Sequence, residues 1–197
     1  MRIVINEFIS LDGVVQAPGG AEEDTDGGFR HGGWSMPFFD PEIMGSEFDT
    51  MPHTTDALLY GRRTWRVMAD AWPGRAGDPF ADWLNGAPKY VVSNTLTEAD
   101  IDWQPTTIIP GDNVVEAVAD LRRRPGGNCS VMGSSQLVRT LLGNDLVDEL
   151  ALMIEPIVLG GGKSIFPSDG VAKTFELAST KTTGTGVHVC RYQRAQN

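Results

Sequence analysis

Two short stretches decide the fold: LLYGRRT at residues 58–64 and VMGSSQ at residues 131–136. Each begins as an apolar strand, reaches a glycine and continues into a helical pattern. A strand that turns into a helix in this way directs free backbone N–H groups and the positive end of the helix dipole at an anion. Two such turns, one carrying Arg62 and Arg63, suit a dinucleotide with separate phosphates better than a single phosphate. Neither turn has the G-x-G-x-x-G spacing or a Walker-type lysine, so neither usual nucleotide motif is present.

Strands and helices alternate on either side of these turns. Apolar runs predict strands at 3–11, 57–60, 89–92, 106–109, 129–132 and 149–159. Helices are expected from Asp40 to about Phe48, from the Gly61 turn to about Ala71, from Asn113 to the stop at 125–127, and from the Gly133 turn to Gly143. Glu116 is expected to pair with Asn113 as a cap, and Gly143 to cap the end of its helix. Residues 73–88 predict a loop with at most one turn around 80–84.

The chain ends in a predicted antiparallel hairpin that pairs 175–183 with 187–193 around Gly184-Thr185-Gly186. Alternating strands and helices followed by a hairpin predict an α/β fold with a mostly parallel sheet and an antiparallel edge. We expect one domain over residues 1–197.

Bulk composition restricts the partners. The formal net charge of −10 disfavours nucleic acid and anionic lipid, and the basic groups at 62–63 and 122–124 are too short to bind a polyanion. The sequence has neither a signal-peptide pattern nor an apolar run of membrane-spanning length, so we expect a cytoplasmic protein. Cys129 and Cys190 each lie in an apolar stretch, which favours two buried thiols over a disulfide, and we expect no metal site.

Residues 18–33 are rich in glycine and acidic side chains and cannot pack a core by themselves. A loop of this length in a compact domain is more often functional than accidental.

The order of these motifs resembles the dihydrofolate reductase superfamily. It is closest to the reductase domain of the bifunctional riboflavin-biosynthesis deaminase-reductase and its stand-alone relatives. The likeness spans residues 3–167 and rests on NEFISLDGVV at 6–15, GRRTW at 61–65, KYVVSNT at 89–95, VMGSSQL at 131–137 and DELALMIEPIVLGGGKSIFP at 148–167. It implies a dihydrofolate-reductase-like three-layer αβα sandwich.

The resemblance also implies a cofactor, NADPH, and positions that hold it. Its 2′-phosphate and pyrophosphate would lie on Gly61, Arg62, Arg63 and Thr64, with one arginine selecting NADPH over NADH. The adenosine half would lie along Ser93, Asn94 and Thr95. The pyrophosphate and nicotinamide ribose would be cradled by Gly133, Ser134, Ser135, Gln136 and Leu137. The alternative interpretation is that both arginines are solvated and Gly133 only starts a helix.

The sequence says less about which residues bind the substrate. In dihydrofolate reductase a carboxylate grips the pteridine, but the matching position here is Gly45, so the resemblance does not extend to folate reduction. The acidic candidates for catalysis are Asp12 and Glu47; Asp12 is otherwise an ordinary turn residue and Glu47 a solvated one. Further substrate candidates are Ser10, beside Asp12, and Trp34, which covers a planar substrate or pins the loop.

We therefore expect an NADPH-dependent oxidoreductase that transfers hydride to a small heterocyclic or carbonyl/imine substrate, similar to 5-amino-6-(5-phosphoribosylamino)uracil reductase. The alternative is a non-catalytic NADPH-binding or regulatory module on the same fold. The deaminase activity is excluded, because the three histidines are scattered and the zinc signature with paired cysteines is missing. A homodimer would match this reductase branch.

Overall fold

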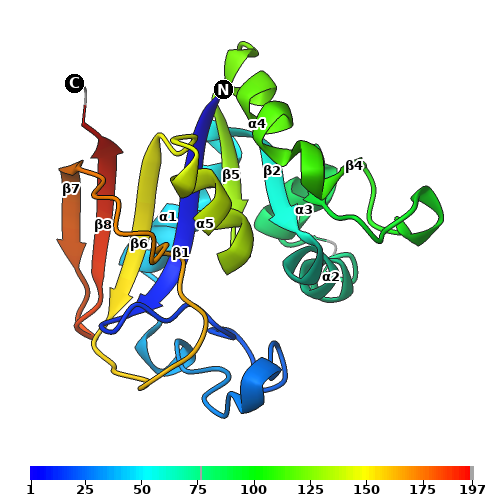
Figure 1. The fold of residues 1–197 in the computed structure, drawn as a ribbon. Helices are drawn as coiled ribbons and strands as arrows, with labels where there is room; N and C mark the ends of the chain where they lie inside the picture. Colours follow the sequence, from blue (N-terminus) through cyan, green and yellow to red (C-terminus); the bar gives the residue numbers. More distant parts are fainter. Residues whose placement is uncertain (76, 196–197) are drawn as a thin grey trace.

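The computed structural model describes residues 1–75 and 77–195. Its centre is an eight-stranded sheet in the order β4-β3-β2-β5-β1-β6-β8-β7. The six strands from β4 to β6 run parallel, and β8 and β7 continue the sheet as an antiparallel hairpin (Figure 1). The predicted α/β class, with a mostly parallel sheet and an antiparallel C-terminal hairpin, is confirmed. The strands are β1 (Arg2–Ser10), β2 (Thr55–Gly61), β3 (Lys89–Val92), β4 (Thr106–Ile109), β5 (Asn128–Met132), β6 (Glu149–Glu155), β7 (Phe175–Thr182) and β8 (His188–Arg194).

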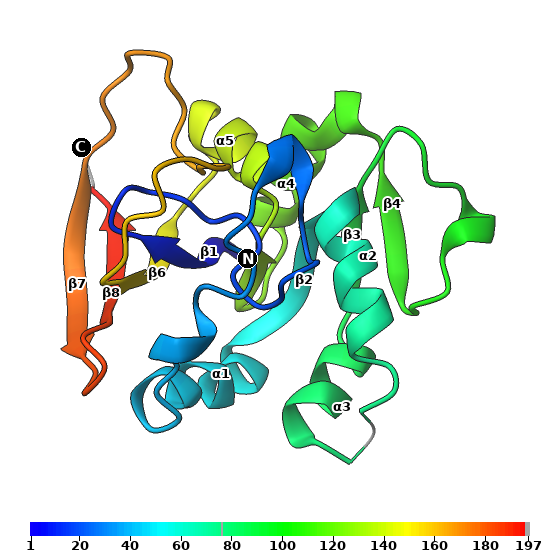
Figure 2. The ribbon, with the colours of Figure 1, turned by 90° about the horizontal axis from the view of Figure 1, so that it is seen from below.

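Helices cover both faces of this sheet, which gives the three expected layers (Figure 2). On one face lie α4 (Val114–Arg123) and α5 (Ser135–Gly143), packed on Ile3, Ile5 and Ile9 of β1. On the other face lie α1 (Ile43–Thr54), α2 (Arg62–Ala71) and α3 (Pro79–Gly86). Because successive side chains of a strand point to opposite faces, β1 contributes to both cores.

The helix starting near Asp40 is longer than predicted. The side chain of Asp40 does accept bonds from the backbone N–H groups of Glu42 and Ile43, at 3.0 and 2.8 Å. However, α1 begins at Ile43 and continues to Thr54 rather than ending near Phe48, with Pro52 tolerated in its last turn.

The expectation of a loop over 73–88 was wrong, because residues 79–86 form α3. Asp78 caps this helix by accepting from the N–H groups of Phe80 and Ala81, and Pro79 occupies its first position. An Asp-Pro pair in these two roles is a helix start signal.

The structure also differs from the prediction at the ends of three elements. The strand from 149 stops at Glu155, because Pro156 follows and cannot donate to the ladder. Asn113 makes no side-chain cap, since a 3₁₀ turn over Gly111–Asn113 leads directly into α4. Gly143 is the last residue of α5, and Asn144 is its C-cap.

Both cysteines are buried free thiols, as predicted. Within the described ranges, no helix is both long and apolar enough to cross a bilayer.

Candidate functional site

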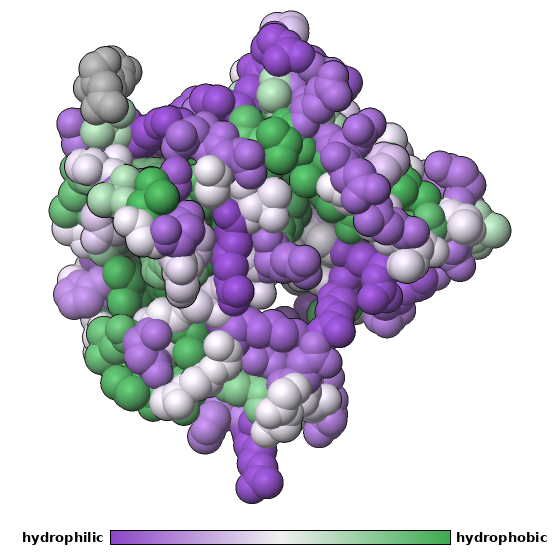
Figure 3. Space-filling view, viewed as in Figure 1, coloured by the Kyte–Doolittle hydropathy of each residue, from purple (hydrophilic) through white to green (hydrophobic). Residues whose placement is uncertain are grey.

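The predicted cofactor residues meet at one edge of the sheet. Strands β2, β3 and β5 are parallel neighbours, and their carboxyl ends lead into Gly61, Ser93 and Gly133. Figure 2 looks onto this edge and shows residues 18–33, in blue, lying in front of it. In Figure 3 the molecule is hollowed through between this segment and the strands above it, and hydrophilic side chains surround the opening.

A single hydroxyl joins the two glycine turns. Ser134 Oγ accepts a hydrogen bond from the Gly61 backbone N–H at 2.7 Å and donates to Thr64 Oγ1 at 2.7 Å. The contact is so close that a Cβ on Gly61 would lie 2.8 Å from Ser134 Oγ. A Cβ on Gly133 would lie 2.9 Å from Thr64 Cγ2, and the φ of Gly133 is +72°. Both glycines are therefore required where the turns touch.

Neither of the helices that start at these turns has a side-chain cap. Asp78 caps α3, whereas α2, like α1 and α4, has no side-chain hydrogen bond from its N-cap residue. The N-cap of α5 is Ser134, at a φ of +76°, and its hydroxyl crosses to the other turn instead of capping its own helix. The first N–H groups of α2 and α5 thus remain available to an anion.

Two arginines follow the first turn, and both are exposed at the surface. Arg63 forms an ion pair with Asp26 of the 18–33 segment. Together with the uncapped helix starts, these guanidinium groups form a donor set that fits the phosphates of a dinucleotide.

The turn after β3 is held in place by its own side chains. Ser93 Oγ accepts from the N–H groups of Thr95 and Leu96, at 3.1 and 3.0 Å. Asn94 Oδ1 accepts from the N–H of Gly111 at 2.6 Å and so ties this turn to the end of β4. Thr95 is exposed.

The first turn of α5 divides between surface and core. Gln136 is exposed and Ser135 is half-buried, whereas Leu137 packs in the core with Ile5 and Ile9. Leu137 can therefore offer a ligand at this edge its backbone N–H but not its side chain.

Ion pairs and a hydrogen bond hold the 18–33 segment in place over the site. Lys163, after β6, forms ion pairs with Asp24 and Asp26, and Asp26 also pairs with Arg63. The indole N–H of Trp34 donates to the Gln16 carbonyl at 2.7 Å, so this buried ring holds the segment to the body. A pocket of about 540 Å³ lies between residues 26–31 and 159–163, with Gln16 also in its wall.

The Ser10–Asp12 turn is held by internal bonds. Asp12 accepts from the Ser10 hydroxyl at 2.6 Å and from the N–H groups of Leu159 and Gly160, at 3.1 and 2.8 Å. The Ser10 bond, followed by these backbone bonds, lowers the pKa of Asp12 to about 2. Asp12 is therefore ionised at neutral pH and fixes the glycine-rich loop, which does not suit a proton donor.

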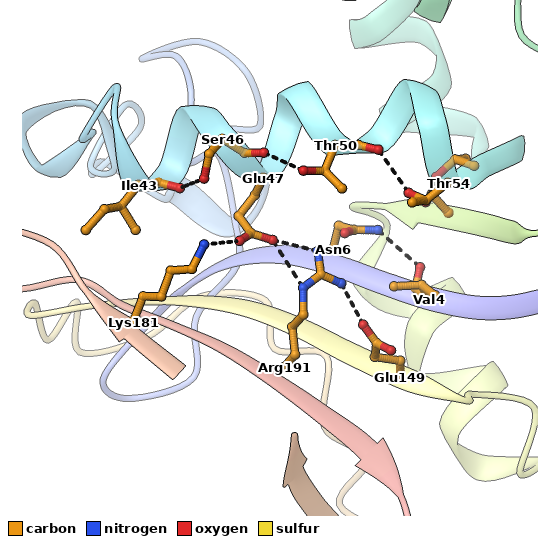
Figure 4. Close-up of polar contacts among 12 residues, drawn as sticks. Val4, Asn6, Ile43, Ser46, Glu47, Thr50, Thr54, Glu149, Lys181 and Arg191 are labelled. Atoms are coloured by element: carbon orange, nitrogen blue, oxygen red, sulfur yellow. Dashed lines mark hydrogen bonds and ion pairs between the residues drawn. The ribbon is translucent and has the colours of Figure 1, made fainter. Parts of the chain in front are cut away.

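Glu47 binds basic side chains of the antiparallel hairpin (Figure 4). It extends from α1 toward the sheet and binds the Arg191 guanidinium of β8, with distances of 2.6 and 3.1 Å, and Lys181 Nζ at 3.5 Å. Arg191 also binds Glu149 at 2.6 Å, at the start of β6. This network joins α1 to the sheet near the start of β6, whereas Glu155 stands at the carboxyl end of that strand.

Two buried acids, Glu7 and Glu155, had not been expected in the site. Each has one carboxyl oxygen that is buried without a hydrogen-bond partner among the described residues. Burial raises the pKa of Glu7 well above its ordinary value, with a further contribution from Glu23. Burial also raises the pKa of Glu155 to about 7, although the Ser35 hydroxyl donates to it at 2.5 Å. The sequence signal for Glu7 is an acid that alternates in line with the core residues Ile3, Ile5 and Ile9 along its strand.

The chain is similar to known proteins in sequence and in fold. The chain is 28% identical over 191 residues to protein YyaP of Bacillus subtilis (strain 168), covering 94% of this chain and 91% of that protein. A structure from Shewanella sp. PV-4, described as a candidate riboflavin biosynthesis protein, aligns over both whole chains with a TM-score of 0.75 and 21% identity. A deaminase/5-amino-6-(5-phosphoribosylamino)uracil reductase from Thermotoga maritima aligns with a TM-score of 0.63 and 13% identity, over 98% of this chain and 56% of that one.

The family model of the RibD C-terminal domain matches residues 2–189. This match covers both glycine turns, the Ser10–Asp12 turn and the glycine-rich loop after β6. The chain belongs to the RibD C-terminal domain family.

Proposed function

We propose that this protein is an NADPH-dependent reductase that transfers hydride to a small heterocyclic or carbonyl/imine substrate, in the manner of 5-amino-6-(5-phosphoribosylamino)uracil reductase. The observation that carries the proposal is the pair of uncapped helix starts, locked side by side by Ser134. One phosphate group of the cofactor lies on each turn, and Arg62 and Arg63 favour the additional 2′-phosphate.

When bound, NADPH supplies the hydride, and the protein's task is to hold an electrophilic carbon at contact distance and exclude water. The pocket between residues 26–31 and 159–163 has the volume of a small-molecule site. Asp26 lines this pocket and also pairs with Arg63, so the pocket adjoins the first glycine turn. We infer that the substrate lies at this edge of the sheet, between the pocket and the two glycine turns.

Titration of the purified protein with NADPH and NADH, followed by tryptophan fluorescence, tests the cofactor. We expect saturable NADPH binding, much weaker NADH binding, and a loss of NADPH affinity in Arg62→Ala and Arg63→Ala. Arg66→Ala is the matched control, because Arg66 lies on the same helix but turns to Asp102 and the Asp100 carbonyl. Absence of binding by either cofactor would refute the proposal.

The competing function is an NADPH-binding module without turnover. It is favoured by the engagement of Asp12 and Glu47 in structural contacts, which leaves neither free to act on a substrate. Saturable NADPH binding without oxidation against a panel of pteridines, pyrimidines and carbonyl compounds would support the module over the reductase.

A further inference from the structure

The partner-less oxygens of Glu7 and Glu155 are the only buried side-chain nitrogen or oxygen atoms without a hydrogen bond in the part of the chain that the structure describes. An ionised carboxylate in such a place is very costly, and the usual outcome is that the group keeps its proton. The two acids lie on the neighbouring strands β1 and β6, in the carboxyl-terminal half of each strand. Two protonated carboxylic acids are therefore expected near the sheet edge that carries the glycine turns at Gly61 and Gly133.

Glu7 occupies the position closer to those turns. The last register pair between β1 and β5 is Asn6 with Met132, so Glu7 lies level with Gly133, where the chain leaves β5 for α5. On its other side Glu7 pairs with Leu152 of β6. Strand alternation places its side chain on the face of Ile5 and Ile9, the face that α5 covers.

Among the residues that the structure describes, no positive group offsets the charge of this acid. The charge that acts on Glu7 is that of Glu23, which has the same sign and belongs to the 18–33 segment. Glu23 is fixed by the N–H groups of Gly19 and Gly20, at 2.8 and 3.1 Å. A strand position between two isoleucines would be more stable with an apolar residue, so an acid kept neutral there breaks the local pattern. Such violations concentrate at functional sites.

We propose that Glu7 is the residue that donates the proton in the reduction, and this assignment rests on the proposed reductase function. Hydride addition to the carbon of a C=N or C=O bond leaves a negative charge on nitrogen or oxygen. The carboxyl O–H bond of Glu7 breaks, a new N–H or O–H bond forms on the substrate, and Glu7 is left as a carboxylate. Water then returns a proton to Glu7 before the next turnover.

Glu155 is less suited to this role. One of its oxygens is already bonded to Ser35, and it pairs in register with Ser10, on the opposite face of the sheet from Glu7. Its side chain is fully buried. It therefore serves as a matched control, a second buried acid at the same edge that α5 does not cover.

Difference infrared spectroscopy with NADPH and NADP⁺ tests the assignment without a known substrate. At neutral pH we expect the carbonyl stretch of a protonated carboxylic acid, assigned to Glu7 by its disappearance in Glu7→Gln. Cofactor binding should shift this band, while the band lost in Glu155→Gln should stay in place. Glu7→Leu, which restores the apolar strand, provides the same assignment should the glutamine variant fold poorly.

The outcomes separate the two proposals. Cofactor binding, measured on the same samples by fluorescence, with an unshifted Glu7 band would overturn the role of Glu7 and leave the reductase standing. An ionised Glu7 at neutral pH would do the same. Failure of NADPH and NADP⁺ to bind wild type would overturn the reductase and the proton donor together. With any substrate that wild type reduces, Glu7→Gln should lower kcat by about 10²–10⁴-fold and leave NADPH affinity unchanged.

Discussion

The hydroxyl of Ser134 lies 2.7 Å from the backbone nitrogen of Gly61, so a side chain that begins one helix fixes the turn that begins another. The same hydroxyl donates to Thr64, and this second bond holds the first turn of α2 against the start of α5. Residues 70 positions or more apart in the chain thereby form one anion-binding surface. A ligand with two phosphate groups would find both turns already in place.

Ser134→Ala should weaken NADPH binding by roughly fivefold, because it removes a link worth about 1 kcal/mol and lets the turns move apart. Fluorescence titration measures the change. Thr140→Ala is the control, since its hydroxyl bonds only to the Gln136 carbonyl within α5. Equal affinities for wild type and Ser134→Ala would show that the cofactor does not depend on this link.

Gly133→Ala should lower the free energy of unfolding by about 1–3 kcal/mol, because alanine is strained at a φ of +72° and its Cβ would press on Thr64. Gly143→Ala, at the other end of α5, has open space around its Cβ and should be neutral or slightly stabilising. Urea unfolding of both variants gives the comparison. A stable Gly133→Ala protein would mean that the two turns are not in close contact.

Much of this site follows from local sequence. The glycines at 61 and 133 are visible because a strand, a glycine and a helical pattern succeed one another within eight residues. Glu7 does carry a local signal, an acid in line with Ile5 and Ile9, but its burial beside Glu23, without a positive partner among the described residues, appears only in the structure. The roles of Asp12 and Glu47 were equally hidden, since Leu159 and Arg191 lie more than 140 residues away along the chain. Helix α3 was missed although its Asp-Pro start is local, because the surrounding glycines and prolines favoured a loop.

Asp26→Asn should strengthen NADPH binding by up to about fivefold, because it frees Arg63 from an exposed ion pair worth about 0.2–1 kcal/mol. Asp24→Asn is the control, since Asp24 pairs with Lys163 and its loss leaves the Arg63 pair in place. The gain should diminish at high salt, where the ion pair is screened in wild type as well. Weaker binding in Asp26→Asn would instead mean that the segment must stay fastened for the cofactor to bind.

Glu47→Gln should leave NADPH affinity unchanged and lower the free energy of unfolding by about 1–3 kcal/mol, because the partly buried Arg191 loses a charged partner. Asp102→Asn, which removes the partner of the exposed Arg66, should cost less than about 1 kcal/mol. Urea unfolding and fluorescence titration separate the two properties. A loss of cofactor affinity in Glu47→Gln would mean that Glu47 contributes to cofactor binding after all.

Glu155 predicts a dependence of stability on pH. Its pKa rises from 4.5 in the unfolded chain to about 7 in the folded protein, so between these values the folded state holds a proton that the unfolded state has lost. The free energy of unfolding is therefore highest, as far as Glu155 is concerned, below pH 4.5. It falls as the pH rises from 4.5 to about 7 and does not change further above that pH. The total loss is at most about 3 kcal/mol. Glu155→Gln cannot ionise and keeps its amide across the range. Urea unfolding at several pH values from 5 to 8 should thus show a steeper decline for wild type than for Glu155→Gln, and parallel curves would mean that Glu155 is ionised in the folded protein throughout.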